Sequence, residues 1–212
     1  MGLREFKKLH TRQQIADEAM RLFVIHGFDH VTVAEVATAA GVSEKTVFNY
    51  FPTKEDLFFD EVPKRAESLV AAIRDREPGE SILNALRRLQ VRECPRLCTP
   101  NFVVFARIIE ESTALQAKEL EVMSRFVHIL TEEIAAELHI DERDARITAG
   151  LLVSVHRQVF RAARKQALEG LHGPVAVERL RGDLERAYEL LESGLGEFER
   201  SSRAVAAASS TT

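Results

Sequence analysis

The sequence predicts an all-α fold with a small N-terminal domain and a larger helical C-terminal domain. Capping residues followed by apolar residues at spacings of three and four recur along the chain. Glycine and proline separate these segments, and alternating β-branched residues never persist long enough to indicate a strand. The 212 residues, of which 45% are hydrophobic, are enough for the cores of one small and one larger domain.

Three helices are expected in the N-terminal domain, residues 1–53. The first begins at Thr11, which starts a capping box, and ends near Gly27. The second begins at Thr32, which starts another capping box, and ends at Gly41, where a residue without a Cβ most easily adopts a left-handed conformation. Ser43 is then a suitable N-cap for a third helix over residues 44–50.

The third helix is expected to have two different faces. Val47 and Phe51, four residues apart, should face inward, whereas Lys45 and Asn49 project from roughly the opposite side. Lysine suits guanine acceptors or phosphate, and asparagine suits the adenine edge. Two short helices joined by a tight turn can place the second helix in the major groove of DNA. Ordinary helical hairpins with small-residue corners are also common, so the spacing alone leaves both interpretations open.

The segment from Thr11 to Phe58 resembles the N-terminal domain of the TetR family of bacterial transcription regulators. The shared pattern is a first helix ending in Gly-Phe, a Thr-capped second helix, Ala-Gly-Val-Ser, Phe-x-Tyr-Phe and Lys-Glu-x-Leu-Phe. The resemblance implies a homodimer that binds a DNA operator and a C-terminal domain that receives a small ligand. It places the family's DNA contacts on nine residues: Thr32, Ser43, Glu44, Lys45, Thr46, Phe48, Asn49, Tyr50 and Lys54.

These residues are expected to fall into two contact classes. Lys45, Thr46 and Asn49 should read bases, and Phe48 should pack against the groove wall. Phosphate anchors are expected at Thr32, Tyr50 and Lys54. Two positions depart from the commonest family pattern: Val33 stands where many members have a second threonine, and Phe48 where many have tyrosine.

The charge of the chain indicates local rather than general DNA binding. The net charge is −4, which does not by itself indicate a nucleic-acid binder. Positive charge gathers near the start of the chain, and with Lys45 and Lys54 it forms a small footprint that favours docking at a specific site. The alternative is a solvated, disordered terminus. The basic residues of this arm, opposed by Glu5, are Arg4, Lys7, Lys8 and Arg12.

Residues 54–200 are expected to form the ligand-binding and dimerisation domain, and residues 201–212 a disordered tail. A long helix should run from Thr53 to about residue 76, and Pro63 inside it should kink it or mark a joint. Further helices are expected at 81–94, 101–111, 114–138, 141–169 and 174–198.

The last two of these helices, at about 142–169 and 174–198, are candidates for the dimer interface. Their apolar coverage is broad, so two such pairs could form a four-helix bundle around a two-fold axis. The alternative is that both helices close the core of a single chain. A dimer would place two recognition helices about one DNA turn apart, ~34–36 Å.

A pocket for a small-molecule effector of unknown identity is expected among the C-terminal helices. Ligand cavities combine aromatic walls with a few polar groups. Aromatic residues at helical spacing are also common in an ordinary core, and His128 suits a hydrogen-bonded core position. The candidate pocket residues are Phe102, Phe105, Glu110, Phe126, His128, His156 and Phe160.

Enzyme, metal and membrane functions lack support in the sequence. It has no glycine-rich phosphate loop, no H-E-x-x-H and no G-x-S-x-G, and its histidines lack ligand spacing, so neither catalysis nor a cofactor or metal is expected. Cys94 and Cys98, around Pro95, could be a redox pair or a soft-metal site, but buried small hydrophobes fit better. No apolar run reaches ~20 residues and no signal peptide is evident, so we expect a cytoplasmic protein that does not bind membranes.

Taken together, the sequence predicts a ligand-responsive transcriptional regulator, with repression favoured. An effector that wedges the helix beginning at Thr53 would alter the spacing of the recognition helices. A coupling of ~1–3 kcal/mol would lower operator affinity about 5- to 150-fold. The alternatives are a TetR-like activator and a small-molecule sensor with no DNA role.

Overall fold

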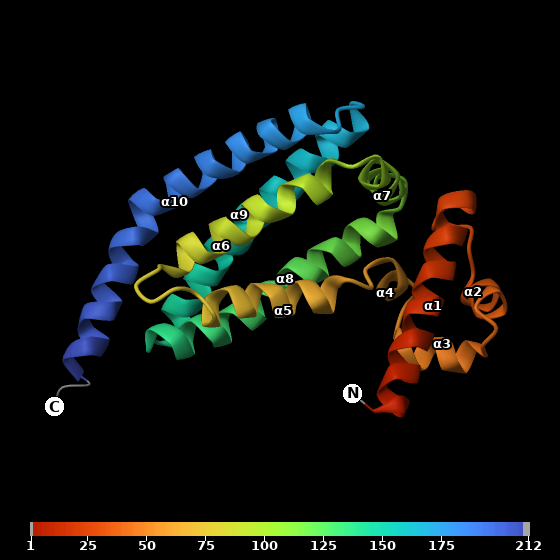
Figure 1. Cartoon of the computed structure of the whole chain (residues 1–212), viewed down its shortest axis with the longest axis horizontal. Helices are drawn as coiled ribbons and strands as arrows, with labels where there is room; N and C mark the ends of the chain where they lie inside the picture. The colour runs from red at the N-terminus through yellow and green to blue at the C-terminus, as the bar shows by residue number, and fades with distance from the viewer. Residues whose placement is uncertain (1, 210–212) are drawn as a thin grey trace. The chain divides into compact units, whose positions relative to one another are not determined.

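The computed structural model describes the backbone of residues 2–209 and the side chains of residues 5–194. Within this part, ten α-helices, one short 3-10 helix and no strand are present (Figure 1), as predicted for an all-α fold. None of the described helices is both long and apolar enough to cross a bilayer. The helices are α1 (Leu3–His26), α2 (Val33–Ala39), α3 (Glu44–Tyr50), α4 (Lys54–Phe58), α5 (Val62–Arg74), α6 (Ile82–Glu93), η1 (Cys94–Cys98), α7 (Pro100–Glu111), α8 (Thr113–Leu138), α9 (Glu142–Leu168) and α10 (Pro174–Ser209).

The chain folds as two compact units. The N-terminal unit comprises the residues up to Pro63 together with Arg107–Glu119, and the C-terminal unit comprises Lys64–Ala106 and the residues from Leu120 onward. The N-terminal unit is therefore larger than the expected domain of residues 1–53. It also contains α4 and the corner where α7 ends and α8 begins.

Aromatic packing explains why α4 belongs to the N-terminal unit. The ring centroids of Phe23 and Phe28 lie 4.9 Å apart, and Phe58 of α4 lies 6.3 Å and 6.2 Å from them. All three side chains are buried. Burying side chains of this size contributes most of the hydrophobic stabilisation in a small core.

The first helix begins earlier than we expected. It starts at Leu3 rather than at Thr11, and Glu5 accepts a hydrogen bond from the backbone N–H of Gly2 at 3.3 Å. Thr11 therefore lies inside the helix, and the capping box predicted there was wrong. Its expected partner Gln14 instead donates its amide to the Ala40 carbonyl at 3.0 Å, which joins α1 to the end of α2. Good helix formers upstream of Thr11 explain the extension.

The long helix expected after Thr53 is broken into two. α4 ends at Phe58 and α5 begins at Val62, with the Val62 N–H donating to the Phe59 carbonyl at 3.0 Å. Pro63 is the second residue of α5, where its missing N–H leaves no helical hydrogen bond unmade. Pro63 therefore marks a joint between two helices, one of the two outcomes expected there, and does not kink a continuous helix.

The C-terminal unit contains the remaining helices, with starts close to those predicted. Ser81 and Asp141 cap α6 and α9, each by accepting a backbone N–H in the first turn. Arg74 of α5 donates two 2.6 Å hydrogen bonds to Glu133 of α8, a bidentate ion pair that joins these helices. α10 continues to Ser209, so it includes the first nine residues of the expected tail, whose alanines favour a helix. Residues 210–212 lie outside the described part.

Candidate nucleic-acid interface

The turn between α2 and α3 has the predicted geometry. The Thr32 hydroxyl accepts the Glu35 N–H at 3.3 Å and donates to the Glu35 carboxylate at 2.8 Å. Hydrogen bonds from the backbone and the hydroxyl of Thr32 lower the pKa of Glu35. Gly41 has a φ of 66°, and the Val42 N–H donates to the Ala37 carbonyl at 3.0 Å. This left-handed turn fixes the direction in which α3 leaves α2.

The two faces predicted for α3 are confirmed. Val47 and Phe51 each retain only 1% exposure and anchor the helix to the core. Lys45 and Asn49 are exposed, and Phe48 keeps 48% of its surface accessible. A large aromatic side chain exposed beside two polar ones is suited to contact another molecule.

The first turn of α3 is closed by its own hydroxyls. Ser43 accepts the Thr46 N–H at 3.1 Å, and the two hydroxyl oxygens lie 2.8 Å apart. Ser43 and Glu44 are exposed, and Thr46 is half-buried. This capping sets the orientation of the helix without using Lys45 or Asn49.

Lys54 has partners within the N-terminal unit. Its ammonium donates to the backbone carbonyls of Phe28 and Val31 at 3.0 Å and 3.1 Å, and lies 4.2 Å from the centroid of the Phe28 ring. Lys54 therefore ties α4 to the loop between α1 and α2. An ammonium has three donors, so one remains for the predicted phosphate contact.

Arg12, one of the basic residues of the predicted arm, is also used inside the unit. Its guanidinium donates to the Asp60 carbonyl at 2.9 Å and lies 4.7 Å from the centroid of the Phe51 ring. Burial raises the pKa of the Asp60 carboxyl, which lies 4.0 Å from Arg12. Arg12 thus holds the segment after α4 and contributes less to an outward basic surface than the sequence suggested.

Comparison with known proteins places this hairpin in a family. The family described as "Bacterial regulatory proteins, tetR family" matches residues 15–60, which contain α2, α3 and α4. The chain belongs to the TetR family. It is therefore a helix-turn-helix transcription regulator, and TetR-family regulators are not enzymes.

One relative and two solved structures extend the similarity beyond the hairpin. The HTH-type transcriptional regulator TcmR of Streptomyces glaucescens is 28% identical over 173 residues, covering 78% of this chain and 76% of TcmR. NalD of Pseudomonas aeruginosa, the secondary repressor of the MexAB-OprM multidrug efflux pump, matches with a TM-score of 0.55 at 19% identity, covering 84% of this chain and 96% of NalD. The SmeT–triclosan complex matches with a TM-score of 0.55 at 16% identity, covering 87% of this chain and 90% of SmeT. At these identities the two structures support the TetR-type fold.

The corner between α7 and α8 is bonded to the helices of this TetR-type DNA-binding unit. The Ser112 hydroxyl donates to Asp29 at 2.8 Å, and the Lys118 ammonium lies 3.0 Å from a carboxylate oxygen of Asp56. Burial opposes ionisation of Asp56, but hydrogen bonds from Lys118 and Thr53 outweigh it and lower its pKa. Asp56 therefore joins this corner to the N-terminus of α4.

Five of the seven candidate pocket residues form two aromatic groups in the C-terminal unit. Phe102 and Phe105 stack at 5.8 Å, and Phe160 meets them edge-on at 5.5 Å and 6.2 Å. Phe126 and His156 form a second contact, at 5.9 Å. The His156 ring reaches solvent only in part: its Nε2 atom is buried and has no hydrogen-bond partner. Burial, with a smaller contribution from Arg65, lowers the pKa of His156 to about 4.

The other two candidates do not join these groups. The His128 side chain is 74% exposed and lies 3.6 Å from Glu132, so its expected place in the apolar core was wrong. His128 lies on the polar side of α8, since Phe126 and Leu130 occupy the buried side. Glu110 is exposed and belongs to the N-terminal unit.

Sequence reasoning missed Gln166, whose side chain is 4% exposed and whose amide N and O have no hydrogen-bond partner. A single glutamine in a helical sequence does not indicate that its side chain will be buried without hydrogen-bond partners.

The two cysteines are buried. Burial raises the pKa of the Cys94 thiol to about 11, and it also raises the pKa of the Cys98 thiol. Such thiols are poor nucleophiles. Over the described residues, no three His, Cys, Asp or Glu side chains gather in a group that could hold a metal ion.

Proposed function

We propose that the chain is a ligand-responsive transcriptional repressor that binds a (pseudo)palindromic operator as a homodimer. In this proposal α3 enters the major groove and a small-molecule effector releases the DNA. The observation that carries the proposal is the outward face of α3, where Lys45, Phe48 and Asn49 are exposed while Val47 and Phe51 anchor the helix.

The contacts follow from this arrangement. Lys45, Thr46 and Asn49 read base edges, and Phe48 packs against the groove wall. Thr32, Tyr50 and the remaining donor of Lys54 hold phosphates on either side of the groove. Ser43 and Glu44 lie at the end of α3 that enters the groove first.

The homodimer is supported by exposed apolar side chains on α9 and α10. Five large ones remain accessible in the single chain: Ile147, Leu151, Leu168, Val175 and Leu190. Isolated exposed apolar residues are ordinary, but these five lie on the two helices expected at the interface, where association would bury them. Burial of ~1,200–2,000 Å² in total would make such a dimer stable.

The effector is proposed to bind beside the aromatic groups of α7, α8 and α9. Phe102, Phe105 and Phe160 offer an apolar surface, and the unpaired Nε2 of His156 offers one hydrogen bond. This combination suits a largely apolar or aromatic ligand with one polar group. Among the structural neighbours, SmeT was solved with triclosan, and NalD is named as the repressor of a multidrug efflux pump.

Release is proposed to pass through the corner between α7 and α8. Both helices continue from the C-terminal unit into this corner, where Ser112 and Lys118 bond to Asp29 and Asp56. A ligand that displaces α7 or α8 would strain these two bonds and thereby α4. This path replaces the single continuous helix expected after Thr53.

The proposal is tested by selecting duplexes from random-sequence DNA with the purified chain, followed by a gel shift. We expect a palindromic consensus bound by a dimer and weakened by an apolar aromatic compound from a ligand screen. Recovery of no consensus would contradict the DNA role and favour the sensor alternative. A reporter assay then separates repressor from activator, because only a repressor lowers expression from an operator that overlaps the promoter. The proposal places the protein in the cytoplasm, where it meets chromosomal DNA.

A further inference from the structure

His156 carries a buried polar atom that its aromatic neighbours leave without a hydrogen bond. Its Nε2 atom is buried and has no partner, and its ring meets Phe126 of α8 edge-on, with centroids 5.9 Å apart. Phe160 lies one turn further along the same side of α9 and belongs to the aromatic group with Phe102 and Phe105. A buried nitrogen of this kind beside apolar rings is suited to a ligand that brings one polar group.

A positive charge acts on this nitrogen. Burial lowers the pKa of His156 to about 4, and the charge of Arg65 on α5 contributes to the shift in the same direction. Charges act strongly on a buried ring only from nearby, because water and salt screen more distant ones. Arg65 is itself half-buried, so its charge is screened less than that of an exposed side chain.

The packing of α5 on α8 independently places Arg65 near the level of Phe126. Arg74 pairs with Glu133 of α8, and Arg76 pairs with a glutamate one turn further along α8, so the two helices run in the same direction. Arg65 precedes Arg74 by nine residues and Phe126 precedes Glu133 by seven. At about 1.5 Å per residue, these two positions differ in level by only about 3 Å.

These groups together favour an anion over a neutral polar group. A carboxylate is costly to bury in an apolar site unless a cation and a hydrogen-bond donor accompany it. Arg65 supplies the cation, and neutral His156 carries a hydrogen on one ring nitrogen, which Nε2 can donate. The rings of Phe102, Phe126 and Phe160 offer apolar surface for the rest of the ligand.

We infer that the effector is an aromatic carboxylic acid, whose carboxylate lies between Arg65 of α5 and His156 of α9. The Nε2–H of His156 donates to one carboxylate oxygen, Arg65 neutralises the charge, and the aromatic body lies against Phe126 and Phe160. The inference rests on the proposed function, because it names the chemistry of the effector for the same site. It adds Arg65, which neither helical spacing nor the aromatic pattern of the sequence indicated.

The test compares aromatic carboxylates with their neutral carboxamides by calorimetric titration of the full chain. The probes are the carboxylates of naphthalene, biphenyl and anthracene, each matched by the primary carboxamide of the same ring system. We expect at least one carboxylate to bind at least about ten-fold more tightly than its carboxamide. In an apolar site without a cation the order would be reversed, because the anion loses more hydration than the amide.

Variants of the two residues assign the preference. Arg65→Gln removes the charge and should bring the two affinities within about three-fold of each other, whereas Arg65→Lys keeps the charge and should retain most of the preference. His156→Phe should weaken the carboxylate more than the carboxamide, because hydrogen bonds to charged groups are the stronger ones. Arg88→Gln, at an exposed ion pair on α6, is the control and should leave the preference unchanged.

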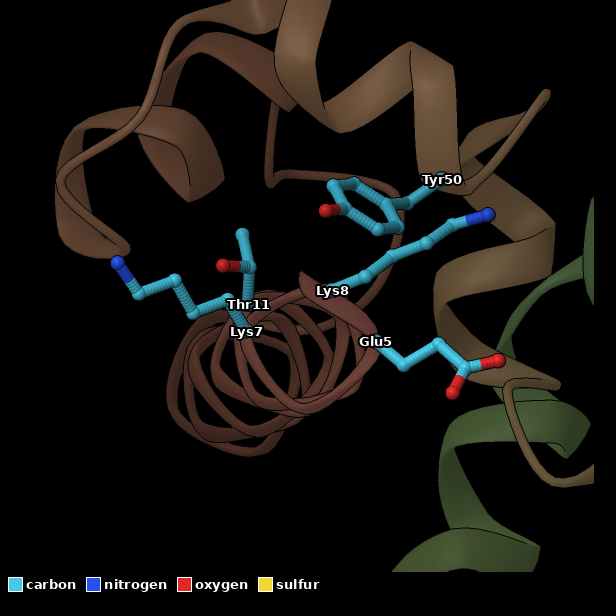
Figure 2. Close-up of a pocket in the computed structure, with 5 residues that line it drawn as sticks. All are labelled: Glu5, Lys7, Lys8, Thr11 and Tyr50. Carbon is cyan, nitrogen blue, oxygen red and sulfur yellow. The ribbon is translucent and has the colours of Figure 1, made fainter. Parts of the chain in front are cut away.

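An anion would also be attracted to an open cleft of the N-terminal unit, which is lined in part by Lys7, Lys8 and Tyr50 (Figure 2). Lys7→Ala/Lys8→Ala tests that site, and loss of carboxylate binding in this variant would overturn the inference. Equal or tighter binding of the carboxamides by the wild type would also overturn it and would leave the proposed function with a neutral effector. Binding of none of the probes would overturn it together with the aromatic effector site. Failure to select DNA would instead contradict the proposed function without altering the preference for carboxylates.

Discussion

The two candidate binding regions of this chain differ in whether their unpaired polar atoms are exposed to water or buried. On α3, Lys45 and Asn49 are exposed, so water solvates them until DNA takes its place. Between α8 and α9, the Nε2 atom of His156 is buried against Phe126 with no partner. An exposed unpaired group costs little, whereas a buried one costs about 1–3 kcal/mol. The outward face of α3 is therefore maintained without loss of stability, whereas the buried Nε2 of His156 carries a cost that a hydrogen-bonding ligand would remove.

The largest expected effect distinguishes Phe51, which anchors α3 to the core, from Phe48, which we expect to contact DNA. Phe51→Ala removes a buried ring under α3 and should cost ~3–5 kcal/mol of unfolding free energy. Phe48→Ala, three residues earlier on the exposed face, should change stability by no more than about 0.5 kcal/mol yet weaken operator binding. Thermal unfolding with a gel shift measures both effects. Equal loss of stability in the two variants would mean that α3 has no free face.

A second test concerns base reading. Asn49→Ala should lower operator affinity by ~1–3 kcal/mol and relax selectivity at one base position, with the melting temperature unchanged. Binding to single-base variants of the selected operator measures this. If all variants lost affinity equally, Asn49 would be a backbone contact.

The effector side predicts a pH effect. The pKa of His156 in the folded chain is about 4, against 6.5 for an unperturbed histidine, so on acidification the unfolded chain takes up its proton first. The stability that neutral His156 contributes is complete above pH 6.5 and is lost as the pH falls toward 4, by at most about 1.4 kcal/mol per pH unit. His156→Phe should flatten the decline in denaturant-derived stability between pH 7 and pH 5. His128→Ala, at an exposed site, is the control and should not flatten it.

The smallest expected effects distinguish Lys45 from Lys54 by operator binding, its salt dependence and the stability of the fold. Lys45→Ala, at a base-reading position, should weaken binding to the selected operator with little change in the salt slope and with stability unchanged. Lys54→Ala, at a phosphate contact, should make the salt slope shallower by about one per subunit. Because it also removes two internal hydrogen bonds, it should lower stability by about 1 kcal/mol or more. Chemical denaturation alongside the salt titration distinguishes them. If Lys54→Ala altered the slope alone, its internal contacts would be energetically unimportant.

The sequence predicted the local structure of the helix-turn-helix better than the packing of the C-terminal unit for a physical reason. Three local features define this hairpin: the start of α2 at Thr32, the turn at Gly41 and the cap at Ser43. Each depends only on residues no more than five positions apart in the sequence. Such local rules can be read directly from a sequence. Thr11 shows the limit of such rules. Its sequence fits a capping box, but the helix formers before it extend α1 back to Leu3.

The effector side depends on contacts between distant helices. Phe102 and Phe160 meet although 58 positions separate them in the sequence, and no local pattern indicates that pairing. His128 was misplaced because helical spacing on a long, broadly apolar helix leaves the buried side ambiguous. Gln166 and the Lys118–Asp56 pair likewise could be found only from the folded chain.

The shortness of α4 has one consequence for control. A helix of five residues does not persist alone in water, so α4 exists only while its neighbours hold it. Asp56 does so twice, by closing the first turn on Thr53 and by pairing with Lys118. Loss of that pair would therefore unfold this turn and release Lys54 from its contacts. An inducer could then act by local unfolding of α4, without a rigid-body movement of a helix.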